Sequence, residues 1–341
     1  MLANFFHRWE ARLARNTRTE RVVRPFEWGL DWIPPNGYPS NAPPNEIVKQ
    51  WIDEVMQDTD AFFAPTPTTD YVFTPGVDNE PGLLTFPSAL MTPHESNNTV
   101  HARFFAAPTK QRAVVVLPQW NSDAGGHLGL SRLLARLGIN ALRISLPYHD
   151  ARMPQELTRA DFIVSSNIVR TVQVCRQAVL DARRALWWLR DQGYERLGLL
   201  GTSLGSCLAM LTASHEPLVR AQALNHVSPF FADVVWRGLS TAHVRAGLEG
   251  NIDLDLLREL WRPISPWSYL DRARGRRTLL VYAKYDLTFP VDLSRKLVDE
   301  FQRLDIPTDV AVLPCGHYST GEAPYKFLDA YYLARFLLRN L

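Results

Sequence analysis

The chain has 341 residues, of which 46% are hydrophobic and 21% charged, the balance of a globular protein that can bury a large core. Its 37 basic and 35 acidic residues give a formal charge of +2, whereas a nucleic-acid-binding protein would show a marked basic excess. We therefore expect no nucleic-acid partner.

The cysteines and the apolar stretches limit where the protein works. Cys175, Cys207 and Cys315 are odd in number and follow no metal-ligand spacing, so we expect no disulfide framework, no metal and no cofactor. No segment reaches the roughly 18 apolar residues of a membrane-spanning helix, and the first residues lack the apolar core of a signal peptide. These features favour a cytoplasmic protein.

Residues 1–98 are expected to form an irregular extension, rich in proline and aromatic residues, that packs on the rest of the protein. Twelve of the 24 prolines lie in the first 100 residues, which predicts only short elements there. At its start, apolar residues at helical spacing predict an amphipathic helix with Phe6 and Trp9 on its apolar face. Such a face favours docking on the protein's own body or on a second subunit of a homodimer. Contact of residues 1–15 with a membrane surface is the alternative.

From residue 99 onward, β-branched runs alternate with longer helical stretches, which predicts an α/β fold with a mostly parallel sheet of about eight strands covered by helices on both faces. The expected strands are Val100–Phe105, Ala113–Leu117, Ala141–Leu146, Leu197–Leu200, Ala221–Asn225, Thr278–Tyr282 and Asp309–Leu313, with Leu83–Phe86 as a candidate edge strand. The expected helices are Leu128–Leu137, Val169–Gln192, Leu204–His215, Leu293–Leu304 and Lys326–Leu338. Residues 99–341 thus form one body, into which residues 230–270 insert two or three helices.

One motif carries chemistry. The segment Gly201-Thr202-Ser203-Leu204-Gly205 follows a predicted strand and opens a predicted helix. GxSxG in that setting predicts a nucleophile elbow, in which glycines on both sides let the chain turn sharply and expose the serine hydroxyl. Ser203 is therefore the candidate nucleophile.

A nucleophilic serine needs a base and an acid that orients the base. Asp286 follows the strand TLLVYAKY, and His317 follows the strand DVAVLP, so both are expected just beyond the carboxyl ends of strands. Asp292, inside the next predicted helix, is the fallback acid. We expect His215 and His226 to be structural.

With GTSLG, YAKYD and CGHYS in place, residues 99–341 resemble the α/β-hydrolase superfamily, in particular its esterase, lipase and dienelactone-hydrolase-like members. The resemblance implies the α/β-hydrolase fold with a small helical lid over the site. It also implies that Ser203 is the nucleophile, that His317 is the general base and then the acid, and that Asp286 fixes the histidine tautomer.

The same chemistry requires two backbone N–H groups that stabilise the developing oxyanion. One is expected from Leu204, directly after the nucleophile. The other is expected from the loop PQWNSDAGG, with Trp120 as first choice and Gln119 as second. His127 and His149 lie on the expected catalytic rim, and His149 is a candidate substrate or positioning residue.

The inserted helices predict an apolar substrate pocket. Its candidate residues are Phe230, Phe231, Trp236, Trp261, Trp267 and Tyr318, together with Trp120 and His149. The alternative is that these aromatic side chains only pack the lid onto the body.

The sequence therefore predicts a serine-dependent carboxylic ester hydrolase that acts on a small-molecule acyl ester. Hydrolysis of a thioester and cleavage of a peptide bond use the same three residues and remain open, because leaving-group preference depends on the shape of the pocket. A non-catalytic binding module with the same fold is the rival from a different class.

Overall fold

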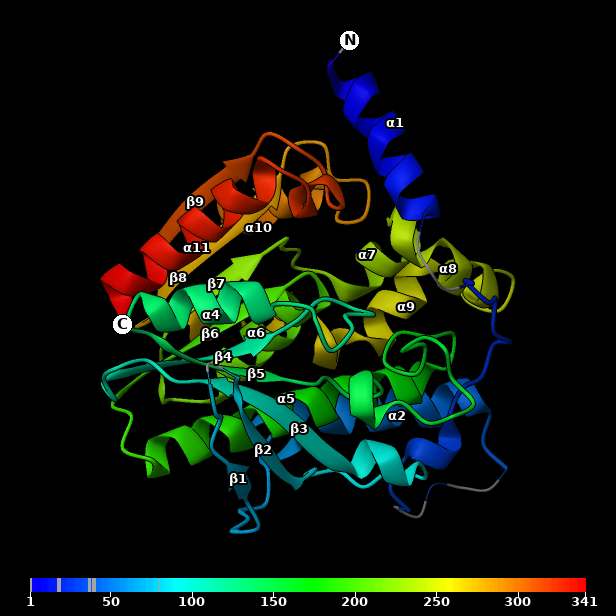
Figure 1. The fold of residues 1–341 in the computed structure, drawn as a ribbon. Coiled ribbons are helices and arrows are strands. Elements are labelled where there is room, and N and C mark those ends of the chain that lie inside the picture. Colours follow the sequence, from blue (N-terminus) through cyan, green and yellow to red (C-terminus); the bar gives the residue numbers. More distant parts are fainter. Residues whose placement is uncertain (1, 17–19, 36–37, 39–40, 79) are drawn as a thin grey trace.

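A mixed β-sheet forms the centre of the computed structural model, which describes residues 2–16, 20–35, 38, 41–78 and 80–341 (Figure 1). Nine strands make up the sheet within these ranges: β1 (Val72–Thr74), β2 (Gly82–Pro87), β3 (Thr99–Phe105), β4 (Arg112–Leu117), β5 (Asn140–Ile144), β6 (Arg196–Thr202), β7 (Val219–Asn225), β8 (Arg277–Ala283) and β9 (Thr308–Leu313). Their order is β1-β2-β3-β5-β4-β6-β7-β8-β9. The pairs from β1 to β5 along this order are antiparallel, and the pairs from β5 to β9 are parallel.

Helices cover both faces of the sheet, as continuous apolar strands such as β4 require. Successive β4 side chains point to opposite faces, so Val115 joins one apolar cluster and Val116 the other. The face of Val115 packs against α2 (Pro44–Gln57), α5 (Ile168–Asp191), α6 (Leu204–His215) and α10 (Val291–Arg303). The opposite face packs against α1 (Leu2–Arg15), α4 (Leu128–Arg136) and α11 (Tyr325–Asn340). Figure 1 shows α4 and α11 on one side of the sheet and α5 on the other.

The insertion at 230–270 forms three α-helices, α7 (Phe231–Arg237), α8 (Ala242–Leu248) and α9 (Leu254–Leu260). Figure 1 shows α7 and α8 beside the end of α1. One short helix, α3 (Thr59–Phe62), and seven 3-10 turns complete the described elements. The turns are η1 (Leu30–Trp32), η2 (Glu95–Asn98), η3 (Asp150–Arg152), η4 (Leu239–Thr241), η5 (Arg262–Ile264), η6 (Pro266–Ala273) and η7 (Ser319–Gly321).

The strands and helices predicted after residue 99 agree with the structure to within two residues at most ends, but the extension differs from expectation. It contains the 14-residue helix α2, whose Pro44 stands at the first helical position, where its missing N–H costs nothing. The prediction of only short elements is therefore wrong. The sheet also starts before residue 99, because β2 pairs along its length with β3, and β1, rather than β2, is the edge strand.

Helix α1 docks on the body through part of its apolar face. Phe6 is buried and stacks on Tyr285, with 4.5 Å between ring centroids, whereas Leu2 and Phe5 are 63% and 60% exposed. In the described part of the chain, no helix is long and apolar enough to span a bilayer.

Candidate active site

Ser203 occupies the sharp turn between β6 and α6. Its backbone lies in the left-handed region with φ of 57°, a strained conformation for a residue with a side chain. A Cβ on Gly201 would lie 2.1 Å from the carbonyl oxygen of Gly205, and one on Gly205 would lie 2.1 Å from that of Leu117. Both glycines are thus required by close backbone contacts, and the turn places Ser203 at the start of α6.

Asp286 follows β8 and is buried, and both of its carboxylate oxygens accept hydrogen bonds. Its Oδ1 accepts the backbone N–H groups of Thr288 (2.8 Å) and Phe289 (2.7 Å), and its Oδ2 accepts from His317 Nδ1 at 2.9 Å. Burial alone would raise the pKa of Asp286. Electrostatic attraction to His317, together with the hydrogen bonds from His226 and His317, outweighs burial and holds the pKa of Asp286 well below its usual range, so the carboxylate stays ionised.

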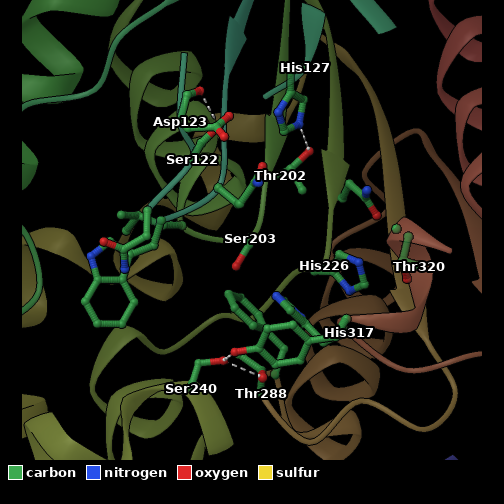
Figure 2. Close-up of a pocket in the computed structure, with 18 of the residues that line it drawn as sticks. Ser122, Asp123, His127, Thr202, Ser203, His226, Ser240, Thr288, His317 and Thr320 are labelled. Atoms are coloured by element: carbon green, nitrogen blue, oxygen red, sulfur yellow. Dashed lines mark hydrogen bonds between the residues drawn. The ribbon is translucent and has the colours of Figure 1, made fainter. Parts of the chain in front are cut away.

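His317 lies in the loop after β9, with its ring stacked on Phe289 at 5.3 Å and an interplanar angle of 12°. Its Nδ1 donates to Asp286, which leaves Nε2 as the basic atom. Figure 2 shows Ser203 and His317 bordering the same space. No hydrogen bond joins their side chains among the described residues, and such bonds commonly shorten only when substrate binds. The structure thus brings Ser203, Asp286 and His317 to one end of the sheet.

A second histidine contacts the same carboxylate. His226, just beyond β7, donates from Nδ1 to Asp286 Oδ2 at 3.0 Å, although it was expected to be structural. The sequence carries one signal for this contact. His226 directly follows a strand, so it could reach the loop after the neighbouring strand, where Asp286 lies. The ligand atoms of His226, Asp286 and His317 lie within 4.8 Å of one another, so these residues could hold a metal ion. A cation there would have to displace the protons on both Nδ1 atoms.

The predicted oxyanion donors flank Ser203. Within the part of the chain that the structure describes, the backbone N–H groups of Leu204, Trp120 and Gln119 donate to no protein acceptor. The Trp120 indole donates to Ala160 O at 2.8 Å, which fixes its ring at the cavity wall. Both candidates for the second donor, Trp120 and Gln119, therefore remain available.

His149 supports this loop from behind. It is fully buried, and its Nε2 accepts the N–H of Asn121 at 2.9 Å, while its Nδ1 donates to Pro147 O at 2.8 Å. Burial lowers the pKa of His149 to about 4, so the ring is neutral and can accept that hydrogen bond. His149 does not line the cavity, so the expectation of direct substrate contact is wrong for it.

A cavity of about 1270 Å³ lies over Ser203, with Trp120, Phe230, Phe231 and Tyr318 among its lining residues. The Tyr318 hydroxyl accepts a hydrogen bond from Arg21 at 3.0 Å and shares another with the Ser240 hydroxyl at 2.7 Å. His127 also lines the cavity and bonds to Thr202 at 2.9 Å, as Figure 2 shows.

Three predicted pocket aromatics do not line this cavity. Trp267 packs behind Phe230, with 5.0 Å between ring centroids, and Trp236 lies under the Arg245 guanidinium. Trp261 is fully buried and donates to a backbone carbonyl of α5. Trp261 and Trp267 thus pack the inserted segment onto the body, through α5 and through Lys296 of α10, which was the alternative interpretation.

Asp292, the fallback acid, does not lie at the site. The exposed side chain of Asp292 forms a bidentate ion pair with Arg237, with both bonds at 2.8 Å. Asp292 does not line the cavity.

Comparison with known proteins places this geometry in context. The family model described as alpha/beta hydrolase domain containing 18 matches residues 86–260. Two Mycobacterium tuberculosis proteins described as uncharacterized, MT2702 and Rv2627c, are each 40% identical over 86 residues, which are 25% of this chain. That segment spans only 21% of each of these curated relatives.

Solved structures share the fold. The acetyl xylan esterase of Paenibacillus sp. R4 has a TM-score of 0.62 at 14% identity, over 91% of this chain and 98% of that one. Acetyl xylan esterase 1 of Thermoanaerobacterium sp. JW/SL YS485 has a TM-score of 0.61 at 15% identity, over 86% and 93%. The acylaminoacyl peptidase of Pyrococcus horikoshii has a TM-score of 0.60 at 12% identity over 80% of this chain, which spans only 42% of the peptidase. At these identities the likeness shows the α/β-hydrolase fold alone.

Proposed function

Because the chain belongs to the alpha/beta hydrolase domain containing 18 family, we propose that it is a serine hydrolase that cleaves a carboxylic ester through Ser203, His317 and Asp286. The observation that carries the proposal is the strained Ser203 at the elbow, which faces the cavity together with a histidine tied to an ionised, buried aspartate. These are the three roles that serine hydrolysis needs.

The mechanism follows from the positions of the groups. His317 Nε2 takes the proton from Ser203 Oγ, which attacks the acyl carbon of the ester. The N–H groups of Leu204 and Trp120 stabilise the oxyanion of the tetrahedral intermediate. The imidazolium then protonates the departing alcohol, and a water molecule deprotonated by His317 hydrolyses the acyl-enzyme.

The cysteines do not compete for the role of nucleophile. Cys207 also lines the cavity, but burial raises the pKa of its thiol well above the ordinary value. Burial likewise raises the pKa of Cys315 to about 12. Neither forms the thiolate that nucleophilic attack requires.

The size and lining of the cavity support a small-molecule acyl ester as substrate. Trp120, Phe230 and Phe289 give it apolar walls near Ser203, which suit an aryl or short acyl group. Two of the three structural neighbours described above are named as esterases, which agrees with this choice.

Covalent labelling tests the proposal. Purified protein should react with a fluorophosphonate probe and hydrolyse p-nitrophenyl acetate or butyrate, whereas Ser203→Ala should lose labelling and about 10⁴-fold or more of the hydrolytic rate. Ser268→Ala, which removes an exposed hydroxyl outside the cavity, is the matched control and should behave as the parent.

Two outcomes would overturn the proposal: no labelling and no hydrolysis by the parent protein, or full labelling of Ser203→Ala. A panel with one acyl group presented as an ester, a thioester and an anilide separates the alternatives, because only the leaving group differs. Ligand binding by the parent protein without labelling would instead favour a binding module.

A further inference from the structure

A single carboxylate oxygen in this site serves two imidazole rings. Asp286 Oδ2 lies 2.9 Å from His317 Nδ1 and 3.0 Å from His226 Nδ1. An ionised carboxylate can only accept hydrogen bonds, so both Nδ1 atoms carry protons. His226 and His317 therefore both direct a protonated Nδ1 at Asp286, and Nε2 is the atom of each ring that can act as a base.

The backbone of His226 is anchored on two sides. Its N–H donates to Val281 O in β8 at 2.9 Å, and its carbonyl accepts the Ser206 hydroxyl of α6 at 2.8 Å. With φ of 56°, the residue turns its ring back toward Asp286. The ring of His226 is thus fixed by the sheet and by the helix that begins beside Ser203.

The two rings face the same cavity. Their centroids are 4.3 Å apart with an interplanar angle of 46°, and both residues line the cavity (Figure 2). His226 is only 2% exposed, and its Nε2 has no hydrogen-bond partner among the described residues. A histidine that served only to fill space would not need to donate a hydrogen bond to Asp286.

We propose that His226 is a positioning residue that acts on His317 through Asp286; this inference rests on the proposed serine hydrolase function. By donating to Oδ2, His226 holds the carboxylate in the plane that His317 needs. The His317 ring, tied to the same oxygen, is thereby kept in the position from which it accepts the serine proton.

The groups that face His226 come from three elements. They are Asp286 after β8, His317 after β9 and Asp329 on α11. Asp329 accepts from Asn225 Nδ2 at 2.9 Å, and burial raises its pKa to about 6. Because Asp329 is a second buried carboxylate close to His226, the experiment must separate its effect from that of Asp286.

The test compares His226→Phe with His226→Asn in the full chain. The Asn amide places its Nδ2 near the position of histidine Nδ1 and can still donate to Asp286, whereas Phe keeps ring volume but donates nothing. Steady-state kcat and KM are measured for the parent, for both variants and for Asp329→Asn. Thermal unfolding shows that each variant is folded.

We expect His226→Phe to lower kcat about 10- to 100-fold with little change in KM, because the base is misplaced. His226→Asn should restore the parent kcat. Asp329→Asn should keep it, since among the described residues Asp329 bonds to Asn225 rather than to Asp286 or His317.

Three results would overturn the inference. In the first, folded His226→Phe keeps the parent kcat. In the second, Asn fails as badly as Phe, which would indicate packing alone. In the third, Asp329→Asn lowers kcat as much as His226→Phe does. If the parent itself neither labels nor hydrolyses, the proposed function fails; an active, Ser203-dependent parent with unaffected His226 variants rejects only the role of His226.

Discussion

A neutral, fully buried histidine shapes the loop from which the proposed second oxyanion donor comes. His149 does not line the cavity, yet its Nε2 accepts the N–H of Asn121, one residue beyond Trp120. In the proposed mechanism the N–H of Trp120 points at a charge that exists only in the transition state, so its direction affects kcat more than it affects substrate binding.

We therefore expect His149→Phe to lower kcat about 10- to 100-fold while KM changes little, because the loop loses its acceptor and the oxyanion donor moves. Steady-state kinetics on a p-nitrophenyl ester measure the effects on kcat and on KM separately. His215→Phe, at a buried histidine outside the cavity, is the matched control and should keep kcat. An equal loss in both variants would point to general destabilisation.

At the scale of elements, helix α1 reaches the loop that carries His317. Glu10 is fully buried, and its carboxylate accepts the N–H groups of Tyr318 and Ser319, both at 2.8 Å, and the Ser319 hydroxyl at 2.6 Å. The same contact explains Gly316 in the CGHYS motif, because a Cβ there would lie 2.3 Å from Glu10 Cδ. The first helix thus fixes the two residues that follow His317.

Glu10→Gln should lower the free energy of unfolding by about 2 kcal/mol, since the amide group turns a donor toward backbone N–H groups that then lack an acceptor. It should also reduce kcat more than it raises KM, because the His317 loop loosens. Urea unfolding and steady-state kinetics test both effects, with Arg12→Ala on the exposed side of α1 as the control. Faster amide exchange at Tyr318 and Ser319 should accompany the loss. Unchanged exchange in Glu10→Gln would contradict this explanation.

The sequence predicted most elements of the body because their signals are local. Residues 204–215 have a helical pattern after a GxSxG turn, and their helix matched to the residue. Helix α2 was not predicted because proline disfavours the interior of a helix. Pro44, however, stands at the first helical position, where proline is tolerated. The three-residue β1 is exposed throughout and has no alternating pattern to detect.

Parts of the site had no local signal. The order of Ser203, Asp286 and His317 predicted that they would lie at the same end of the sheet, because the carboxyl ends of parallel strands meet there. The contact of Glu10 with Tyr318 joins residues 308 positions apart, and nothing near either residue indicates it. The lid aromatics show the same limit, since composition cannot tell which of Phe230 and Trp267 faces the cavity.

For the whole molecule, buried neutral histidines make stability depend on pH. Burial lowers the pKa of His149, His215 and His243 from 6.5 to about 4. The unfolded chain would take up protons at these residues below pH 6.5, whereas the folded chain would resist uptake until about pH 4. Stability is therefore full above pH 6.5 and falls as the pH drops from 6.5 toward 4.

Replacement of His215 measures how much of this pH dependence of stability comes from that one residue. Its ring packs between Phe63 and Tyr269, so His215→Phe keeps an aromatic ring in the space but cannot take up a proton. We expect the loss of unfolding free energy between pH 7.5 and pH 5 to be smaller in the variant by about 2 kcal/mol, from 1.5 pH units at 1.4 kcal/mol each. Urea titrations at both pH values give the comparison. The exposed His7→Gln should leave the difference unchanged, and an equally steep loss in His215→Phe would refute the assignment.

The contact of Glu10 with the loop after β9 also determines when the site can be completed during protein synthesis. Residue 10 leaves the ribosome before Tyr318 and Ser319, which lie 308 and 309 residues further along the chain. Until those residues emerge, α1 lacks the backbone donors for its buried carboxylate, and the loop that carries His317 lacks its support. Ser203 therefore remains without an ordered His317 beside it until Tyr318 and Ser319 have been translated.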